Sequence, residues 1–172
     1  MPQYKDYFQE ARIDGIILYN LTNEDLLNLN VHSELHHISI KRAIQVLRVS
    51  GFNPNCLKRR PTSDEKNDKA DVIYWTNHRV MEWLRSIDLS EYAPNLRGSG
   101  VHGGLMVFEP RFNSTILADI LSIPSSKTLL RRHLNTHFIE LIGSENQLIK
   151  REAELQASYQ PLSAANKVKL VS

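Results

Sequence analysis

Apolar residues recur at helical spacing in two stretches of the chain, residues 1–52 and residues 71–143. The clearest stripe lies in the second stretch, where apolar side chains stand at positions i, i+3, i+4 and i+7: Val80, Trp83, Leu84 and Ile87. Residues at this spacing share one face of an α-helix. Thr76, just before the stripe, is a suitable N-cap. The pattern predicts a helix over residues 75–87.

Further helices are expected downstream. Ser90 is a candidate cap for a short helix over residues 91–96, and another short helix is predicted over residues 113–121. The final helix has an apolar face and a mostly basic face, formed by Leu130, Leu134, Phe138 and Leu141 and by Lys127, Arg131, Arg132 and Asn135. The apolar run at residues 104–108 could form a strand, but it has no hairpin partner. The stretch is therefore predicted to be all-α.

The first stretch repeats the second. The correspondence pairs residues 13–15 with 101–103, residues 29–31 with 121–123, and residues 40–44 with 130–134. Thr22 and Asp25 have the spacing of a capping box at the start of a helix. The chain thus contains two copies of one helical unit of roughly 65–70 residues, near the lower end of what folds alone.

The first copy is shorter, because nothing before Tyr4 corresponds to the helix over residues 75–87. That helix should bury several large side chains, each worth about 1.5–3 kcal/mol. Its absence removes ~5–10 kcal/mol, as much as the whole stability of a small domain. We therefore expect the first copy to depend on packing against the second copy, against residues 144–157 or against a partner.

Composition shifts give the predicted boundaries. Residues 1–52 form an incomplete helical unit, and residues 53–70 are a polar linker rich in turn formers. Residues 71–143 form a complete helical unit. Residues 144–172 are a mostly polar tail that we expect to be partly helical or disordered.

Composition and charge exclude several classes of protein. The chain is 41% apolar and 23% charged, with a net charge of +2, which argues against disorder and against a protein that coats nucleic acid. Cys56 is the single cysteine, so an internal disulfide is excluded and a reducing compartment is favoured. No apolar run reaches the ~18–20 residues of a membrane span, and the N-terminus is not a signal peptide. We expect a cytoplasmic protein.

Candidate chemistry is sparse. His133 and His137 stand at i and i+4, but a zinc site needs two further ligands. The glycines at residues 98–104 lack the Lys-Ser/Thr of a phosphate-binding loop. No Ser-His-Asp arrangement is evident. We therefore expect no enzyme activity, no metal site and no cofactor.

Several strings in the two copies carry the pattern of a known family. In the second copy they are residues 75–84, 89–92, 99–104 and 121–123, the last opening a basic final helix; in the first copy they are residues 7–8, 13–15, 26–27, 29–31 and 40–44. The strings resemble sterile alpha motif (SAM) domains. Residues 75–84 and 99–104 resemble the tandem SAM region of the liprins, and the two copies together resemble the second and third SAM domains of liprin-beta. The resemblance covers about residues 3–143. It implies an all-α fold of two small SAM-type bundles in tandem, of which the N-terminal one is truncated.

The resemblance also implies a function. It indicates a non-enzymatic scaffold fragment that binds the SAM region of liprin-alpha, and through it LAR-type receptor phosphatases, at cell adhesions or synapses. Two alternatives remain, an RNA-binding SAM module and a SAM homopolymer formed by self-association. The near-neutral charge argues against RNA, since such binding relies on clustered basic residues.

The resemblance implies two kinds of interface. SAM domains pair when the N-terminal end of one final helix, which carries partial positive charge, meets a mid-loop surface of another domain. The end-helix candidates are His36, His37 and Lys41 in the first copy and Ser126, Lys127 and Arg131 in the second. The mid-loop candidates are Asp14, Glu24 and Asp25 in the first copy and His102 and Glu109 in the second. The alternative for each residue is a solvated helix face without a partner.

Overall fold

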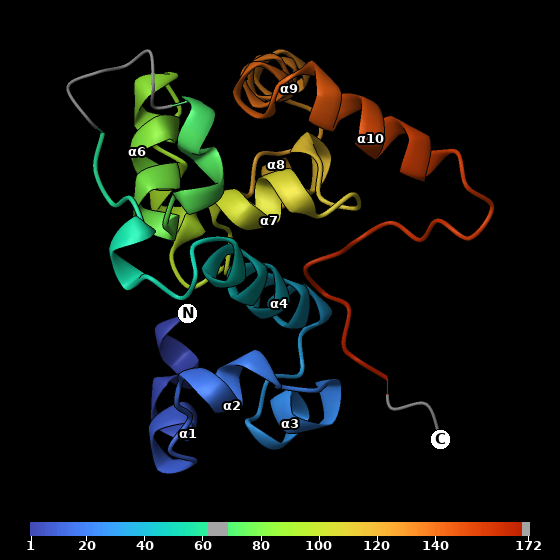
Figure 1. Ribbon diagram of the computed structural model, residues 1–172. Helices are drawn as coiled ribbons and strands as arrows, with labels where there is room; N and C mark the ends of the chain where they lie inside the picture. Colours follow the sequence, from blue (N-terminus) through green and yellow to red (C-terminus); the bar gives the residue numbers. More distant parts are fainter. Residues whose placement is uncertain (62–68, 170–172) are drawn as a thin grey trace.

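The computed structural model describes residues 1–61 and 69–169, and these residues are folded into helices joined by turns and loops (Figure 1). Within them, β-type pairing is limited to two isolated bridges, Ser33 with Lys167 and Lys58 with Trp75. The apolar run at residues 104–108 is helical. The prediction of an all-α fold is confirmed.

The N-terminal unit (residues 1–52) contains a 3-10 turn and four α-helices: η1 (Pro2–Tyr4), α1 (Lys5–Glu10), α2 (Gly15–Tyr19), α3 (Asn23–Asn28) and α4 (Glu34–Val49). The capping box predicted at α3 is present. The Thr22 hydroxyl accepts a hydrogen bond from the Asp25 amide, and the Asp25 carboxylate accepts one from the Thr22 amide. Local sequence therefore fixes where this helix starts.

The C-terminal unit (residues 71–143) is the more complete bundle. Its elements are η3 (Lys69–Tyr74), α6 (Asn77–Ser86), η4 (Ala93–Leu96), α7 (Gly103–Phe108), α8 (Ser114–Ile120) and α9 (Thr128–Ile142). The predicted cap at Thr76 is confirmed, because its side chain accepts from the Arg79 amide.

The helix expected over residues 91–96 is shorter than predicted. It is the 3-10 turn η4, whose N-cap position is held by Tyr92 without a side-chain hydrogen bond. Pro94 lies at the start of this turn, where the missing amide hydrogen of proline costs nothing. The proposed cap at Ser90 is therefore wrong.

The linker and the tail both fold back onto the bundles. After η2 (Pro54–Cys56), the Lys58 amide donates to the Tyr74 carbonyl at 2.8 Å, and the Thr76 amide donates to the Lys58 carbonyl at 3.0 Å. The middle of the predicted linker, residues 62–68, lies outside the described residues. Beyond the C-terminal unit, α10 (Ser144–Glu154) is followed by an irregular segment that runs to residue 169.

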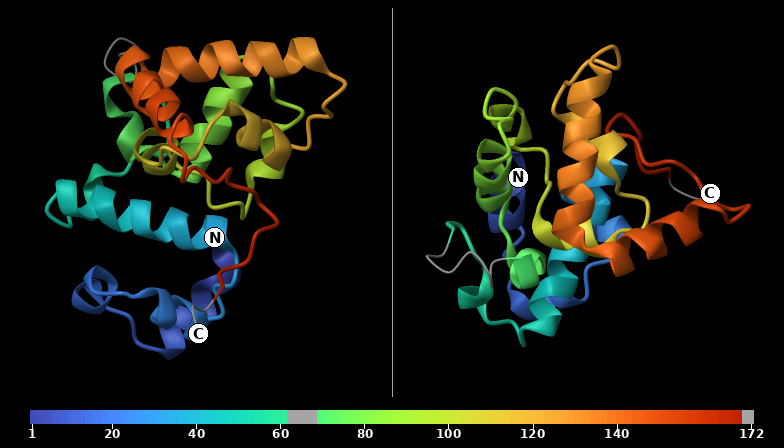
Figure 2. Two further views of the ribbon diagram at one scale, coloured as in Figure 1. Left: turned by 90° about the vertical axis from the view of Figure 1, so that its right-hand side faces the viewer. Right: turned by 90° about the horizontal axis from the view of Figure 1, so that it is seen from above.

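Two apolar clusters of unequal size hold the chain together. The large cluster fills the C-terminal unit and includes Phe112, Phe138 and Trp83. The small cluster, in the N-terminal unit, consists of Leu26, Leu29 and Val31 with partly buried neighbours. Leu35 of α4 belongs to the large cluster. Accordingly, α4 lies between the short helices α1 to α3 and the C-terminal unit (Figures 1 and 2). The N-terminal unit packs on its neighbour through α4, which is one of the three supports that we expected for it.

Candidate protein-interaction site

The junction between the two units is formed by α4 and the start of α7. The Ser39 hydroxyl donates to the Gly100 carbonyl at 2.6 Å. His102 places Nε2 2.9 Å from the Ser39 carbonyl, while its Nδ1 accepts from the Leu105 amide and caps α7. Because Nδ1 accepts, Nε2 carries the proton and donates. One histidine thus caps a helix of one unit and binds the backbone of the other.

Buried charges lie at the other end of this junction. Glu109 is 6% exposed, and one of its carboxylate oxygens accepts from Nε and Nη2 of Arg42 on α4, at 3.1 and 2.9 Å. Lys150 of α10 is 2% exposed and donates to the Glu109 carbonyl at 2.6 Å. Burial lowers the pKa of Lys150 to about 8, against the raising effect of the Glu109 carboxylate. The arrangement joins α4, the end of α7 and α10.

The end-helix residues of the N-terminal unit are largely occupied within the chain. His37 is 3% exposed, and its Nε2 binds the Val31 carbonyl. His36 is half-buried, and its Nδ1 lies 2.6 Å from the Tyr4 hydroxyl. Lys41 is exposed and lines a groove between α4 and the C-terminal segment. Of these residues, only Lys41 has an exposed side chain.

The end-helix residues of the C-terminal unit are more accessible. Ser126 and Lys127 are exposed, and Lys127 holds the N-cap position of α9 without forming a side-chain cap. Its ammonium lies 3.1 Å from the Tyr92 hydroxyl, and this hydrogen bond raises the pKa of Lys127. Arg131 is half-buried and donates to the Ile123 carbonyl and the Asp119 carboxylate. Its role within the unit is to hold the turn before α9.

The mid-loop residues also differ in exposure between the two units, with the exposed ones in the N-terminal unit. In the N-terminal unit, Asp14, Glu24 and Asp25 are exposed, although Asp14 caps α2 and Asp25 belongs to the capping box of α3. The hydrogen bonds from Thr22 lower the pKa of Asp25. In the C-terminal unit, His102 and Glu109 both face α4. The mid-loop surface of the C-terminal unit is therefore covered by the N-terminal unit.

Sequence reasoning missed the apolar side chains beside these charges. Ile16 is 77% exposed on α2, next to exposed Tyr19, and the two line a shallow apolar groove with Phe52. Leu129 is 76% exposed in the first turn of α9. The repeat contained a signal for Ile16, because its counterpart is Gly104, which lies against Val46 of α4. Comparing the copies position by position would have marked α2 as an uncovered face.

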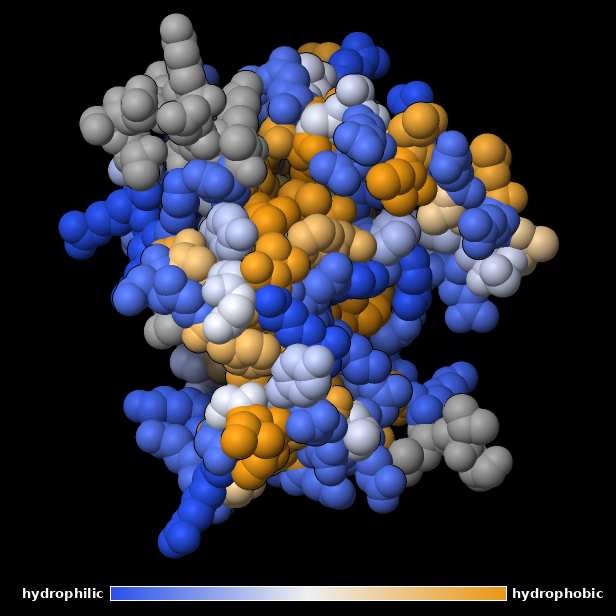
Figure 3. Space-filling model, viewed as in Figure 1, coloured by the Kyte–Doolittle hydropathy of each residue, from blue (hydrophilic) through white to orange (hydrophobic). Residues whose placement is uncertain are grey.

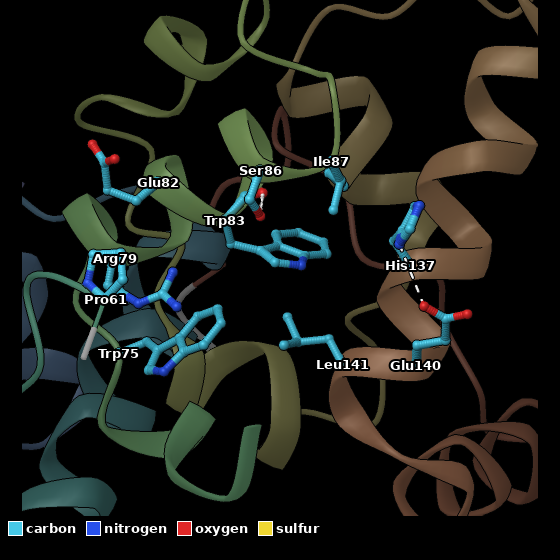
Figure 4. A pocket seen from close by; sticks show the side chains of 10 residues that line it. All are labelled: Pro61, Trp75, Arg79, Glu82, Trp83, Ser86, Ile87, His137, Glu140 and Leu141. Atoms are coloured by element: carbon cyan, nitrogen blue, oxygen red, sulfur yellow. Dashed lines mark hydrogen bonds and ion pairs between the residues drawn. The ribbon is translucent and has the colours of Figure 1, made fainter. Parts of the chain in front are cut away.

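A second apolar surface lies between α6 and α9 (Figure 3). Its groove is lined by Trp75, Trp83, Ile87 and Leu141, and His137 and Glu140 stand at its rim (Figure 4). Both tryptophans are buried and belong to the large core cluster, so this groove is the outer edge of the core. Across the described residues, no three His, Cys, Asp or Glu side chains come together as a metal site would require.

Three histidines at these surfaces make stability depend on pH. Burial lowers the pKa of His36, His37 and His102. In the unfolded chain these histidines are protonated near pH 6.5, whereas in the folded chain they are protonated only at lower pH. The free energy of unfolding therefore falls as the pH decreases.

We expect the Tm to drop by several degrees between pH 7.5 and pH 5, as followed by circular dichroism. His102→Asn keeps an N-cap acceptor but removes one titrating ring, so its drop should be smaller. Identical pH profiles for the two proteins would contradict this assignment.

Comparison with known families decides what these bundles are. A SAM domain (sterile alpha motif) model matches residues 72–142, and a second SAM domain model matches residues 1–48. The chain belongs to the SAM family. The two matches fall on the two bundles that the repeat predicted, and the N-terminal one lacks a helix equivalent to α6.

The relatives of this SAM pair include liprins. Mouse liprin-beta-1 is 62% identical over 169 residues, which are 98% of this chain and 17% of the relative. The liprin-beta homolog of Caenorhabditis elegans is 40% identical over 99% of this chain and 17% of the relative. Human liprin-alpha-4 is 34% identical over 86% of this chain and 13% of the relative. The resemblance to the SAM region of liprin-beta is confirmed, and the chain spans less than a fifth of these relatives. The similarity supports a role in protein interaction.

None of the helices in the described residues combines the length and the apolar character that crossing a bilayer requires.

Proposed function

We propose that this chain is the interaction module of a non-enzymatic scaffold and that it pairs with the SAM region of a liprin-alpha protein. Support comes from its similarity to both liprin-beta-1 and liprin-alpha-4. It also comes from the two candidate surfaces that remain uncovered when α4 fills the junction. In this proposal, liprin-alpha connects the chain to LAR-type receptor phosphatases at cell adhesions or synapses.

The observation that carries the proposal is that one uncovered surface has exposed carboxylates, the other has exposed basic side chains, and each has an exposed apolar side chain. On the first, the acidic surface, Asp14 and Asp25 line grooves with exposed Ile16, and Glu24 is exposed on the neighbouring helix α3. The basic surface has Lys127 near exposed Leu129. Exposed ion pairs add little affinity, so apolar anchors must supply most of the binding energy. Both requirements of SAM pairing are thus met at each surface.

The partner is tested by titrating the full chain with the SAM region of human liprin-alpha-4, the part that aligns with this chain. We expect saturable binding in calorimetry that weakens moderately with salt, because charge complementarity contributes to recognition. Absence of heat and of co-elution at micromolar concentration would contradict the proposal.

Charge reversal at Lys127 should weaken this pairing. Lys127→Glu places a negative charge at the N-terminal end of α9, where it opposes an acidic partner surface. We expect an affinity loss of about tenfold or more, since like charges at an interface cost several kcal/mol. Arg151→Glu, an equal reversal on the exposed face of α10, is the control and should bind normally. Equal affinity for both variants would remove α9 from the interface.

Self-association is a second candidate, favoured by the presence of both surfaces in one chain. The basic end of α9 in one molecule has the charge to meet the acidic surface of another. Such contacts join different surfaces of neighbouring molecules. They extend into filaments unless the rotation from one molecule to the next closes them into a ring. Light scattering should then show a mass that grows with concentration, and Lys127→Glu should return the protein to monomer.

A further inference from the structure

The irregular segment after α10 crosses from the C-terminal unit to the N-terminal unit. It leaves α10, passes the N-terminal end of α4 and approaches α3 (Figure 2). We call residues 160–169 of this segment the C-terminal strap. At its start, the Gln160 carbonyl accepts from Nε of Arg111 at 2.8 Å, and Leu162 is buried in the large core cluster. The strap is therefore anchored on the C-terminal unit before it reaches α4.

The strap then pairs with the backbone that leads into α4. The Glu34 amide donates to the Asn166 carbonyl at 2.9 Å, and the Val168 amide donates to the His32 carbonyl at 2.9 Å. These two bonds surround the antiparallel bridge between Ser33 and Lys167. The strap thus adds a short extended segment to the entrance of the helix.

Side chains of the C-terminal unit and of the strap also bind the start of α4. The Glu34 carboxylate accepts from Nη1 of Arg111 at 2.8 Å and from the Asn166 amide group at 3.2 Å. One carboxylate at the start of α4 therefore binds the C-terminal unit and the strap together. Charge-assisted hydrogen bonds of this kind are stronger than neutral ones.

The strap forms one wall of a groove at the end-helix surface of the N-terminal unit. The groove between α4 and the strap is lined by His37 and Lys41, two of the end-helix candidates, as well as by Val168. The strap leaves part of this surface unsatisfied, because Nδ1 of His37 is buried without a hydrogen-bond partner among the described residues. A protein that bound the N-terminal end of α4 would need the volume and the backbone groups that the strap uses.

We propose that the C-terminal strap is a resident ligand of the α4 N-terminus and that it must leave before a SAM partner binds there. This inference rests on the proposed function, since the competing partner is the SAM region of liprin-alpha. The strap then sets how many docking surfaces the chain presents. With the strap in place, the acidic surface and the α9 end are open; with the strap released, the α4 end is open as well.

The test uses the full chain and a proline pair. Val168→Pro removes the amide that binds the His32 carbonyl. The control is Ala157→Pro, which lies outside the strap at the second position of the turn closed by the Tyr159 amide and the Gln156 carbonyl, where proline is favoured. The first readout is hydrogen exchange of the Glu34 amide. Because Glu34 is the first residue of α4, its amide has no partner within the helix, so its protection reports the strap. The second readout is the affinity for the SAM region of human liprin-alpha-4.

A strap that occupies the site about nine-tenths of the time lowers the apparent affinity of a competitor about tenfold. We therefore expect Val168→Pro to speed exchange at Glu34 and to tighten probe binding by about tenfold, while Ala157→Pro changes neither. Adding Lys41→Glu to Val168→Pro should abolish the gain, because Lys41 lines the groove that the partner would enter.

Three negative outcomes are distinguishable. Faster exchange at Glu34 with unchanged probe affinity would overturn the competition and leave the proposed function standing. Loss of probe binding in every variant, the unmodified chain included, would overturn the proposed function and the competition with it. Unchanged exchange at Glu34 in Val168→Pro would show that the strap is not what protects the helix entrance.

Discussion

Replacing Gly103 by alanine is expected to destabilise the C-terminal unit by about 3 kcal/mol or more, since overpacking a rigid site costs this much. A Cβ at this position would lie 1.6 Å from the Val72 carbonyl oxygen and 3.0 Å from Cβ of Trp75. The clash is with backbone, which cannot rotate away. In addition, the Gly103 amide donates to the Trp75 carbonyl at 2.9 Å, so retreat of α7 would break this bond.

The internal repeat supplies the control. Gly15 corresponds to Gly103 in the N-terminal unit, and a Cβ there would meet nothing within 4 Å. Gly15→Ala should be neutral or slightly stabilising, because alanine favours the helix more than glycine does. Urea unfolding of the two variants measures the difference. Equal midpoints would show that the close approach of η3 to α7 is not rigid.

Replacing Glu109 by glutamine is expected to cost about 2 kcal/mol or more. Removing one member of a buried ion pair leaves the other charge without compensation. Here Arg42 loses its carboxylate, and Lys150 loses the nearby negative charge that favours its protonated form. The expected minimum lies below the ~3–5 kcal/mol of fully buried pairs, since Arg42 is partly exposed.

The ion pair between Arg42 and Glu109 should contribute to holding the N-terminal unit on the C-terminal unit. In a double-mutant cycle with Arg42→Ala, most of the Glu109→Gln effect should disappear, because the two side chains share one interaction. Glu152→Gln, on the exposed face of α10, is the matched control and should change stability by less than ~0.5 kcal/mol. Full additivity in the cycle would show that the ion pair does not hold α4 on the C-terminal unit.

Helix starts were predictable wherever a polar cap stands beside an apolar stripe. Thr76 and Thr22 both cap the helices expected of them, because a cap and its stripe lie within one turn of each other in sequence. The prediction of a cap at Ser90 was wrong for a related reason. No apolar stripe of helical length follows it, so η4 is placed by packing and by Pro94.

The candidate interface residues show that local sequence does not determine which charged side chains are exposed. Lys127 and Asp14 are exposed, as a charged residue at a helix start is expected to be. Glu109 has the same character in the sequence, yet it is buried because Arg42, 67 residues earlier in the chain, reaches it. Nothing in the neighbourhood of either residue signals the other.

The amino-acid sequence by itself determined the longer helices, the caps at Thr22 and Thr76, the duplication and the family, since each of these depends on residues that are close in the chain or on strings that both copies retain. Only the tertiary structure decided which surfaces stay open. Burial of His37, Glu109 and Lys150, and the path of the C-terminal strap over α4, depend on contacts between segments far apart in sequence. Such contacts form only when apolar faces and buried charges of both units are satisfied together, and no local pattern records that condition.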